Sequence, residues 1–465
     1  MEAQQASCAR CILLRQLNSK LWAMHSYGQY RESILEVVSM LRRLETDLSD
    51  YELLLDLQRR LIRLICATER QVVGLKQQRA ALKANRRSGR HGKAESATIK
   101  SQATEVSTAL ETAQHMLFIW RCFGDGIAFL YINKYALKHM LYDSADYSVK
   151  QHAGALSGKD GFRLEWKILH KVLQRGVPAV LCDITNTLRH GDVCVLAGPD
   201  PYPIEVKSSA NRNARVDRQL AQLKQLHDFL GTDEAVNFRG LKHVKRVEAP
   251  VSTVNHGAAM NRCIAQAWNA GFAQTSPEEG LTYFCVRDPE LADKLDFGLG
   301  ARKLLMFLNE PKTECGWVPY FPFTLSIRSA EALYEFISGE ISLAVLLDTT
   351  TLVRMFADRG FDAQFVDDPH WEIVVRRHGA DPAAAPMSAI SRPLFARIFL
   401  EFESLSWLPE REAWFINYME QEGQAQGERI ARGEVRPEDL MTGPVPTFRP
   451  RKWPIPLMDS GQQSD

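Results

Sequence analysis

Residues 191–207 read GDVCVLAGPDPYPIEVK, and this stretch decides how the fold is interpreted. Its two apolar runs predict strands over residues 192–196 and 204–208, joined by a turn that is dense in Gly, Pro and Asp. If the two strands pair as an antiparallel hairpin, the carboxylates of Asp192 and Glu205 can converge at one end of the sheet.

The second run, Ile204-Glu205-Val206-Lys207, has the alternation of a strand with one buried face. Side chains two residues apart on a strand point to the same side, so Glu205 and Lys207 share one face. Ile204 and Val206 then face the core. Two carboxylates on adjacent strands suit Mg²⁺, which prefers hard oxygen ligands, and the backbone carbonyl of Val206 is a further candidate ligand. A lysine beside them can orient or deprotonate the water that attacks a phosphodiester, although a surface ion-pair ladder is the alternative interpretation of these charges.

The elements around this hairpin follow a regular order. Apolar residues at helical spacing predict a helix over residues 162–173, and the apolar run 178–184 suits a buried strand. After the two strands of the hairpin, residues 212–230 return to helical spacing. The expected order is therefore helix, three strands, helix.

An Asp followed about a dozen residues later by Glu-x-Lys on the next strand resembles the signature of the PD-(D/E)xK superfamily of restriction-endonuclease-like nucleases. The resemblance implies an αβββα core and a nuclease that depends on Mg²⁺, for which Mn²⁺ can substitute. It implies that Asp192 and Glu205 are metal ligands and that Lys207 is the catalytic lysine. Many members add an acidic ligand from the preceding helix and a polar catalytic residue from the following helix, and Glu165 and Gln219 match these places.

Basic and polar residues on both sides of the motif are candidates for phosphate contacts. The stretch 76–100 carries eight Lys and Arg residues against the single acid Glu95, and it contains the helix-breaking residues 87–92. We expect the tip of a long helical hairpin there, with a solvated loop as the alternative. The residues after Lys207 are the second candidate, with a polar strand-to-helix loop as the alternative. The candidate nucleic-acid contacts are Ser208, Ser209, Arg212, Arg215, Arg218, Arg86, Arg87 and Arg90.

The predicted class is α+β or α/β, in four regions along the chain. The regions are a helical region with a coiled-coil-like hairpin (1–145), a nuclease-like core (146–250, with the resemblance over about 160–250), a mixed α/β extension of unknown role (251–380), and a helical segment with a Pro-rich tail (381–465). Within the first region, a capping-box pattern predicts that Ser49 begins a long helix. Gly124-Asp125-Gly126 predicts a break in a later, buried helix.

The amino-acid composition limits the kinds of protein that this chain can be. The chain has 465 residues, of which 45% are hydrophobic and 24% charged, so it can bury a sizeable core without disulfides. Its net charge of +1 means that any nucleic-acid surface must come from local clustering. Nine scattered cysteines suit a reducing cytoplasm, and metal binding by the lone pair Cys8 and Cys11 stays open. We expect a cytoplasmic protein with no membrane association, because no run is long and apolar enough to span a bilayer.

These observations lead to one expectation and two alternatives. We expect an endonuclease that acts on double-stranded DNA, and the resemblance implies a role in bacterial defence against phage, with a protein partner in such a system. Cutting both strands with one metal site per chain favours a homodimer or larger oligomer, built through the helical region. One alternative is a catalytically silent nuclease fold that serves as a scaffold or binding module. The other is a ribonuclease, because a metal site contacts the phosphate and does not distinguish the sugar of RNA from that of DNA.

Overall fold

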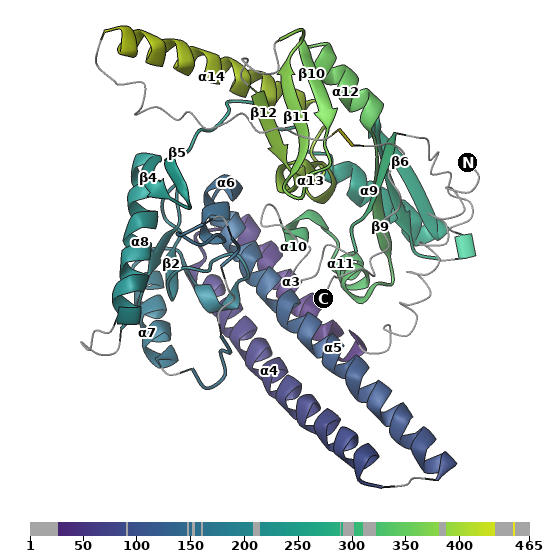
Figure 1. The fold of residues 1–465 in the computed structure, drawn as a ribbon. Coiled ribbons are helices and arrows are strands. Elements are labelled where there is room, and N and C mark those ends of the chain that lie inside the picture. Colours follow the sequence, from purple (N-terminus) through teal and green to yellow (C-terminus); the bar gives the residue numbers. More distant parts are fainter. Residues whose placement is uncertain are drawn as a thin grey trace. The chain divides into compact units, whose positions relative to one another are not determined.

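The computed structural model describes residues 27–89, 92–146, 148–150, 154–159, 161–207, 214–288, 290–291, 302–309, 322–380, 387–432 and 450–451. This part of the chain is a mixed α+β structure with long helices near the N-terminus and four small antiparallel sheets (Figure 1). The chain forms two units: the hairpin unit (20–246 and 311–340) and the C-terminal unit (1–19, 247–310 and 341–465). Among the described residues, no helix is both long enough and apolar enough to cross a membrane.

The hairpin unit is built on three long helices. They are α3 (Arg31–Thr46), α4 (Tyr51–Ser88) and α5 (Lys93–Tyr131). α4 and α5 form the predicted antiparallel hairpin, which is the long pair of helices in Figure 1. An apolar seam joins them within the one chain, for example where Val72 packs with Leu110 and Ala113.

The start of α4 differs from the capping-box prediction. Asp50, not Ser49, is the N-cap, because its carboxylate accepts a hydrogen bond from the Leu53 amide at 2.8 Å. Ser49 instead donates its amide to the Asp47 carboxylate at 3.0 Å. The Asp side chain satisfies one of the free amides that every helix leaves at its first turn.

The predicted break at Gly124-Asp125-Gly126 is wrong, since α5 continues through these residues. Both glycines lie where the helix meets its neighbours closely. A Cβ on Gly124 would stand 1.9 Å from the carbonyl oxygen of Ile184, and a Cβ on Gly126 would stand 3.0 Å from the Leu41 side chain. Close packing therefore explains these glycines, and the helix tolerates their lower propensity.

A three-stranded antiparallel sheet lies between two helices in the order that the sequence predicted. The elements are α7 (Phe162–Leu173), β1 (Ala179–Leu181), β2 (Val193–Val195), β3 (Tyr202–Ile204) and α8 (Ala214–Thr232), and the strand order is β1-β2-β3. The predicted third strand over 204–208 is wrong for the described residues 205–207, because pairing with β2 ends at Ile204.

The outer edge of β1 is covered by a side chain of α4. Gln58, which is fully buried, donates to the carbonyl of Ala179 at 3.0 Å and accepts from the amide of Leu181 at 3.0 Å. The amide thus takes the place of a fourth strand and satisfies two backbone groups that would otherwise be buried without partners.

Shorter elements complete the hairpin unit. They are η1 (Gly28–Tyr30), α6 (Lys134–Leu137), η2 (Lys138–Met140), η3 (Cys182–Ile184), β4 (Glu234–Phe238), β5 (Leu241–Lys245), α10 (Phe323–Ser326) and α11 (Ala330–Ser338). The last two return to α3 late in the chain: Arg42 donates to the carbonyls of Thr324 and Ile327, both at 2.7 Å.

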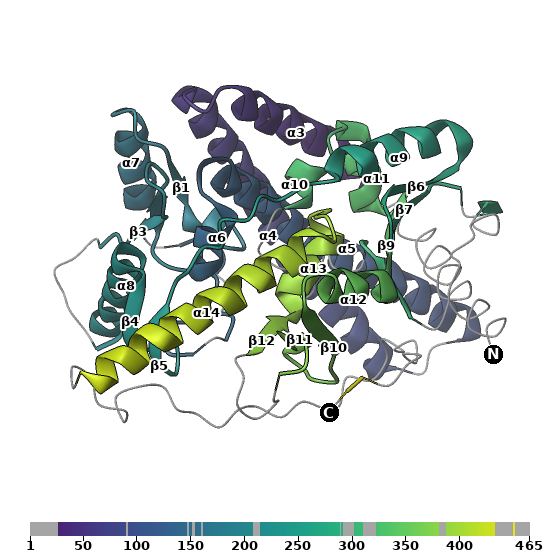
Figure 2. The same ribbon diagram turned by 90° about the horizontal axis from the view of Figure 1, so that it is seen from above.

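The C-terminal unit contains a four-stranded sheet and a three-stranded sheet, both antiparallel. The first has the order β6-β7-β9-β8, with β6 (Phe272–Glu278), β7 (Leu281–Val286), β8 (Lys303–Phe307) and β9 (Ser342–Asp348). α9 (Gly257–Ala270) lies against β6 and β7 (Figure 2). The second sheet consists of β10 (Phe361–Phe365), β11 (Trp371–Arg377) and β12 (Met387–Ser391), accompanied by α12 (Thr349–Ala357), α13 (Arg392–Leu400) and α14 (Trp407–Ala431).

A buried ion cluster organises the end of α13. The Arg397 guanidinium, which is fully buried, donates to the carboxylates of Glu401 and Glu403, each at 2.9 Å. Its other neighbour is Trp407, whose ring centroid lies 4.4 Å away. The buried guanidinium is thus paired with two carboxylates, which is the usual condition for burying a charge.

Candidate active site

Three carboxylates of the hairpin unit converge on one ammonium group. The Nζ of Lys159 lies 3.0 Å from the Glu165 carboxylate, 2.6 Å from Asp183 Oδ2 and 3.2 Å from Asp192 Oδ1. Glu165 and Asp183 are buried and Lys159 is partly exposed. Two of the three acids, Glu165 and Asp192, are residues that the sequence pattern selected.

Each acid comes from a different element. Glu165 lies in the first turn of α7, and this helix begins directly after Gly161, whose φ of +92° lets the chain turn sharply into it. Asp183 follows the last residues of β1, in η3. Asp192 immediately precedes β2. The sheet and the helix therefore fix all three carboxylates at one end of β1 and β2.

The backbone at Gly191 passes very close to that of Ile204, and this close approach fixes the position of Asp192. Gly191 has a φ of +76°, and a Cβ on it would stand 3.0 Å from both the nitrogen and the oxygen of Ile204. The amide of Asp192 donates to the Ile204 carbonyl at 2.9 Å, and its carbonyl accepts from the Cys182 amide at 2.9 Å. Asp192, the residue before β2, is thus held by backbone hydrogen bonds on both sides.

The Glu-x-Lys residues, 205–207, come directly after β3, and Val206 among them contacts Asp192. The amide of Val206 donates to Asp192 Oδ2 at 2.8 Å, so a side chain replaces the backbone partner that a continuing strand would have. Because the Asp192 side chain takes the place of this backbone partner, the pairing of β3 with β2 ends at Ile204. Glu205 is mostly buried, and its Oε1 accepts from the ammonium of Lys207 at 2.6 Å. The structure therefore brings Glu165 and Asp192 together on Lys159, and it places Glu205 next to the residue whose amide binds Asp192.

Burial and neighbouring charges shift the pKa values of two groups in this cluster, Glu165 and Lys159. Burial raises the pKa of the Glu165 carboxyl, and the hydrogen bond from Lys159 only partly offsets this effect. Burial alone would lower the pKa of Lys159, but the hydrogen bond and charge of Asp183, helped by Glu165 and Asp192, outweigh burial and raise it. Lys159 is consequently a permanent cation at neutral pH.

A second lysine, Lys150, contacts His190 and feels the charge of Glu205. The Nζ of Lys150 is 3.2 Å from Nδ1 of His190, and Nε2 of His190 is 2.9 Å from the carbonyl of Tyr142. Burial lowers the pKa of His190 to about 4, so the ring is neutral at pH 7. Nε2 then carries the proton and donates to Tyr142, while Nδ1 accepts from Lys150. Burial also lowers the pKa of Lys150, and the charge of Glu205 opposes this shift.

The helical hairpin holds the two loops that carry the cluster. The carboxylate of Glu69 on α4 accepts hydrogen bonds from the amides of Leu156 at 2.9 Å and Ser157 at 2.7 Å. On α5, Arg121 donates its Nε to the carbonyl of Asp183 at 3.2 Å. The loop of Lys159 and the turn of Asp183 are therefore both fastened to the hairpin.

Asp125 of α5 fastens the chain after η3. Its carboxylate accepts from the amides of Asn186 at 2.9 Å and Thr187 at 2.8 Å. Burial raises the pKa of Asp125 to about 6, although these hydrogen bonds favour the ionised form. The hairpin is thus part of the framework of the site.

The donor set fits Mg²⁺ chemically, because carboxylate oxygens are the ligands that this ion prefers. Within the described residues, no group of three or more His, Cys, Asp and Glu side chains is placed so that it could hold a metal ion directly. The three carboxylates instead surround an ammonium at 2.6 to 3.2 Å, which is wider than the Mg–O distance of about 2.1 Å. The residues that would hold the ion are Glu165, Asp183 and Asp192.

The other predicted residues are placed as follows. Gln219 is half-buried and Arg218 exposed on α8, and no contact of Gln219 with the three carboxylates is present among the described residues. Arg215 belongs to α8 by its backbone. Arg86 and Arg87 are exposed at the end of α4. Outside the described residues lie Ser208, Ser209, Arg212, Arg90, Cys8 and Cys11.

Sequence reasoning missed Asp183, Lys159 and Glu69. Asp183 had a usable signal, since it is the first charged residue after the buried run of β1. Lys159 and Glu69 had none, because a loop lysine and one acid in a long helix acquire their roles only from contacts that the fold creates.

Exposed cations line one side of the distal half of α4. Lys76, Arg79, Lys83, Arg86 and Arg87 recur at intervals of one to four residues, and all are exposed. On an ideal helix they span an arc of roughly 100° over about 16 Å. We call these five residues the basic stripe. No ion pair of the stripe with another described residue is present.

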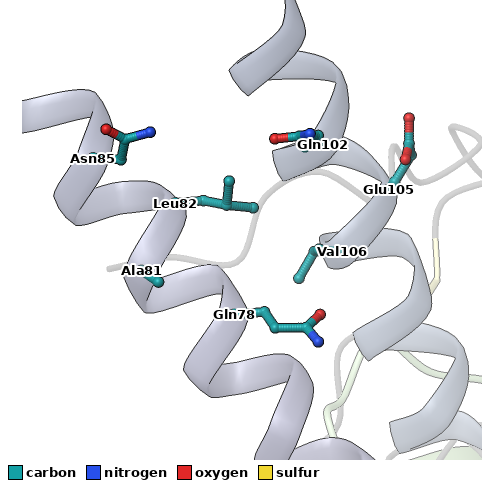
Figure 3. Close-up of a pocket in the computed structure, with 7 residues that line it drawn as sticks. All are labelled: Gln78, Ala81, Leu82, Asn85, Gln102, Glu105 and Val106. Atoms are coloured by element: carbon teal, nitrogen blue, oxygen red, sulfur yellow. The ribbon is translucent and has the colours of Figure 1, made fainter.

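A groove lined by both apolar and polar side chains lies between α4 and α5 in the same distal half. Its volume is about 470 Å³, and Figure 3 shows Leu82 and Val106 pointing into the space between the helices. The remaining lining residues are Gln78, Ala81, Asn85, Gln102 and Glu105. The groove shares no residue with the Lys159 cluster and offers no group suited to phosphodiester hydrolysis.

Comparisons of the chain with family models, with curated proteins and with solved structures found no match. The function is therefore inferred from the site's own geometry together with the sequence pattern.

Proposed function

We propose that this protein is a metal-dependent nuclease that hydrolyses phosphodiester bonds, in double-stranded DNA before other substrates. The observation that carries the proposal is the convergence of Glu165 and Asp192, both selected by the sequence pattern, with Asp183 on a single cationic centre. In this proposal, α7, the three strands and α8 are a restriction-endonuclease-like core of the PD-(D/E)xK type.

The chain's own residues divide the chemistry between them. Glu165, Asp183 and Asp192 would hold Mg²⁺, which supplies charge neutralisation at the scissile phosphate and an acidified water. The ammonium of Lys207 lies 2.6 Å from Glu205 Oε1, and Lys207 is the residue next to Val206, whose amide binds Asp192; in the proposal this ammonium would orient the attacking water and offset developing charge. The amide of Val206 fixes the Asp192 carboxylate so that its second oxygen faces the centre.

Contacts to the nucleic acid would come from the basic stripe and from Arg218 on α8. Exposed cations without ion-pair partners are suited to phosphates, since binding releases the counterions of the polymer without first breaking a salt bridge. These contacts position the substrate and do not read its sequence.

A cleavage assay tests the proposal. Plasmid and linear DNA, with an RNA duplex in a parallel arm, are incubated with Mg²⁺ or Mn²⁺ and wild-type protein, Lys207→Ala, Asp192→Ala or Lys167→Ala. Lys167 is an exposed lysine on α7 and serves as the matched control. We expect cutting by wild type and the control, and loss of at least a hundredfold in the other two variants. Equal cutting by wild type and Lys207→Ala would show that the site is wrong.

One observation favours a second candidate, a catalytically silent fold that serves as a scaffold. Lys159 already forms an ion pair with each of the three carboxylates, as it would in a purely structural ion cluster. A silent fold predicts that Mn²⁺ changes the melting temperature of neither wild type nor Asp192→Ala. The nuclease predicts a metal-dependent rise in wild type alone.

A further inference from the structure

The ammonium of Lys159 and a metal ion would draw on the same oxygens. The contacts of 3.0, 2.6 and 3.2 Å to Glu165, Asp183 and Asp192 use the carboxylate groups that the proposed function assigns to the metal. Two cations at contact distance repel each other strongly in a partly buried site. Occupancy by one therefore works against occupancy by the other.

Lys159 is the member of the cluster that can move. The three acids are fixed by α7, β1 and β2, and Asp192 is additionally held by the amide of Val206. The Lys159 side chain is 26% exposed and reaches the cluster from the turn before α7 through a flexible four-carbon stem. A change of side-chain rotamer is enough to take the ammonium into solvent without any change in the sheet.

The hairpin sets the position from which Lys159 reaches the acids. Glu69 of α4, itself buried, accepts the amides of Leu156 and Ser157 at 2.9 and 2.7 Å. The amide of Lys159 closes this turn on the carbonyl of Leu156 at 3.3 Å. Glu69 is thus a positioning residue: it acts through the turn that carries Lys159, and its carboxylate also lies 3.6 Å from Arg121.

We infer that Lys159 is a tethered counter-ion that occupies the centre of the site in the metal-free protein and must be displaced for metal to bind, with Glu69 holding it in place. The inference rests on the proposed function. It makes the metal-free site a closed state, and it links the opening of the site to the helical hairpin. A partner or nucleic acid that shifts the turn of residues 156–159 would raise the affinity for metal without touching a ligand.

Isothermal titration of the full chain with Mn²⁺ tests this inference without any cleavage. The variants are Lys159→Met, Glu69→Gln, Asp192→Asn and Lys167→Met, the last being the matched control on α7. We expect Lys159→Met to bind Mn²⁺ at least tenfold more tightly than wild type, Glu69→Gln to bind severalfold more tightly, and the control to bind like wild type. Asp192→Asn should lose binding.

Equal or weaker binding by Lys159→Met, with Asp192→Asn still impaired, overturns the inference and leaves the metal site standing. Absence of Mn²⁺ binding in both wild type and folded Lys159→Met overturns the metal-dependent function itself. Lys159→Met leaves three carboxylates without their cation and can therefore fail to fold. In that case Glu69→Gln tests the inference, since it keeps Lys159, Glu165, Asp183 and Asp192 and all their charges. Wild-type affinity in folded Glu69→Gln would then contradict the inference.

Discussion

At the scale of single residues, Asp183 makes the shortest of the three contacts with Lys159, at 2.6 Å, although it lies outside the Asp-to-Glu-x-Lys pattern. Asp183→Asn keeps the shape of the side chain and removes its charge. We expect at least a tenfold loss of Mn²⁺ affinity and of DNA cleavage, because one hard, anionic ligand is lost. Titration calorimetry and a plasmid assay measure both, with the exposed Asp217→Asn as control. Wild-type values in Asp183→Asn would show that Asp183 serves only as the partner of Lys159.

His190 gives a residue-scale prediction about pH. Its pKa is lowered to about 4 by burial, whereas an unfolded histidine titrates near 6.5. Between these values the unfolded chain binds more protons, so the stabilisation is complete above about pH 6.5 and is lost as the pH falls toward 4. We expect wild type to lose about 2 kcal/mol more between pH 8 and pH 5 than His190→Gln, whose amide can keep both hydrogen bonds.

Denaturant unfolding of both proteins at the two pH values measures this difference. Equal losses in wild type and His190→Gln would mean that His190 is not held neutral. The same depressed pKa predicts that the ring contributes no inflection near pH 6.5 to a cleavage profile.

At the scale of elements, the short sheet depends on α4. Gln58 supplies both an acceptor and a donor to the open edge of β1. Gln58→Leu leaves the Ala179 carbonyl and the Leu181 amide buried without partners, so we expect a loss of about 3 kcal/mol in the free energy of unfolding. Gln77→Leu, on the exposed side of the same helix, should change it by less than about 0.5 kcal/mol. Denaturation followed by circular dichroism compares the two, and equal effects would remove the edge-capping role of Gln58.

Elements whose causes are local could be predicted from the sequence. The helix over 162–173 has the predicted bounds, because the periodicity of its apolar residues determines it. Distant contacts decided two of the features that were predicted wrongly. Gly124 is required by Ile184, 60 residues later, and β3 ends where the Asp192 carboxylate takes the Val206 amide. Asp192 and Glu165 could be selected because each occupies a recognisable place in the sequence pattern, before Glu-x-Lys and on the preceding helix. Lys159 could not be selected, because a lysine in a loop has no such place.

At the scale of the whole molecule, the net charge of +1 leaves no general attraction for nucleic acid, so binding must depend on where the cations gather. The basic stripe is the test case. Replacing Arg79, Lys83, Arg86 and Arg87 with Gln changes the formal net charge from +1 to −3 (1 − 4 = −3). A control with the same net charge replaces four exposed cations elsewhere in the hairpin unit, namely Lys167, Lys171, Arg175 and Lys242.

The two variants separate local from global electrostatics. If the stripe contacts phosphates, its loss should weaken binding to a DNA duplex and lower the slope of log K against log salt concentration by up to about 0.9 for each contact removed. The control has the same net charge, so its slope should stay close to that of wild type. Fluorescence anisotropy over a range of salt concentrations gives both slopes. Equal changes in the two variants would assign the effect to net charge and would leave the hairpin with its other role, that of holding Lys159 and Asp183 in place through Glu69 and Arg121.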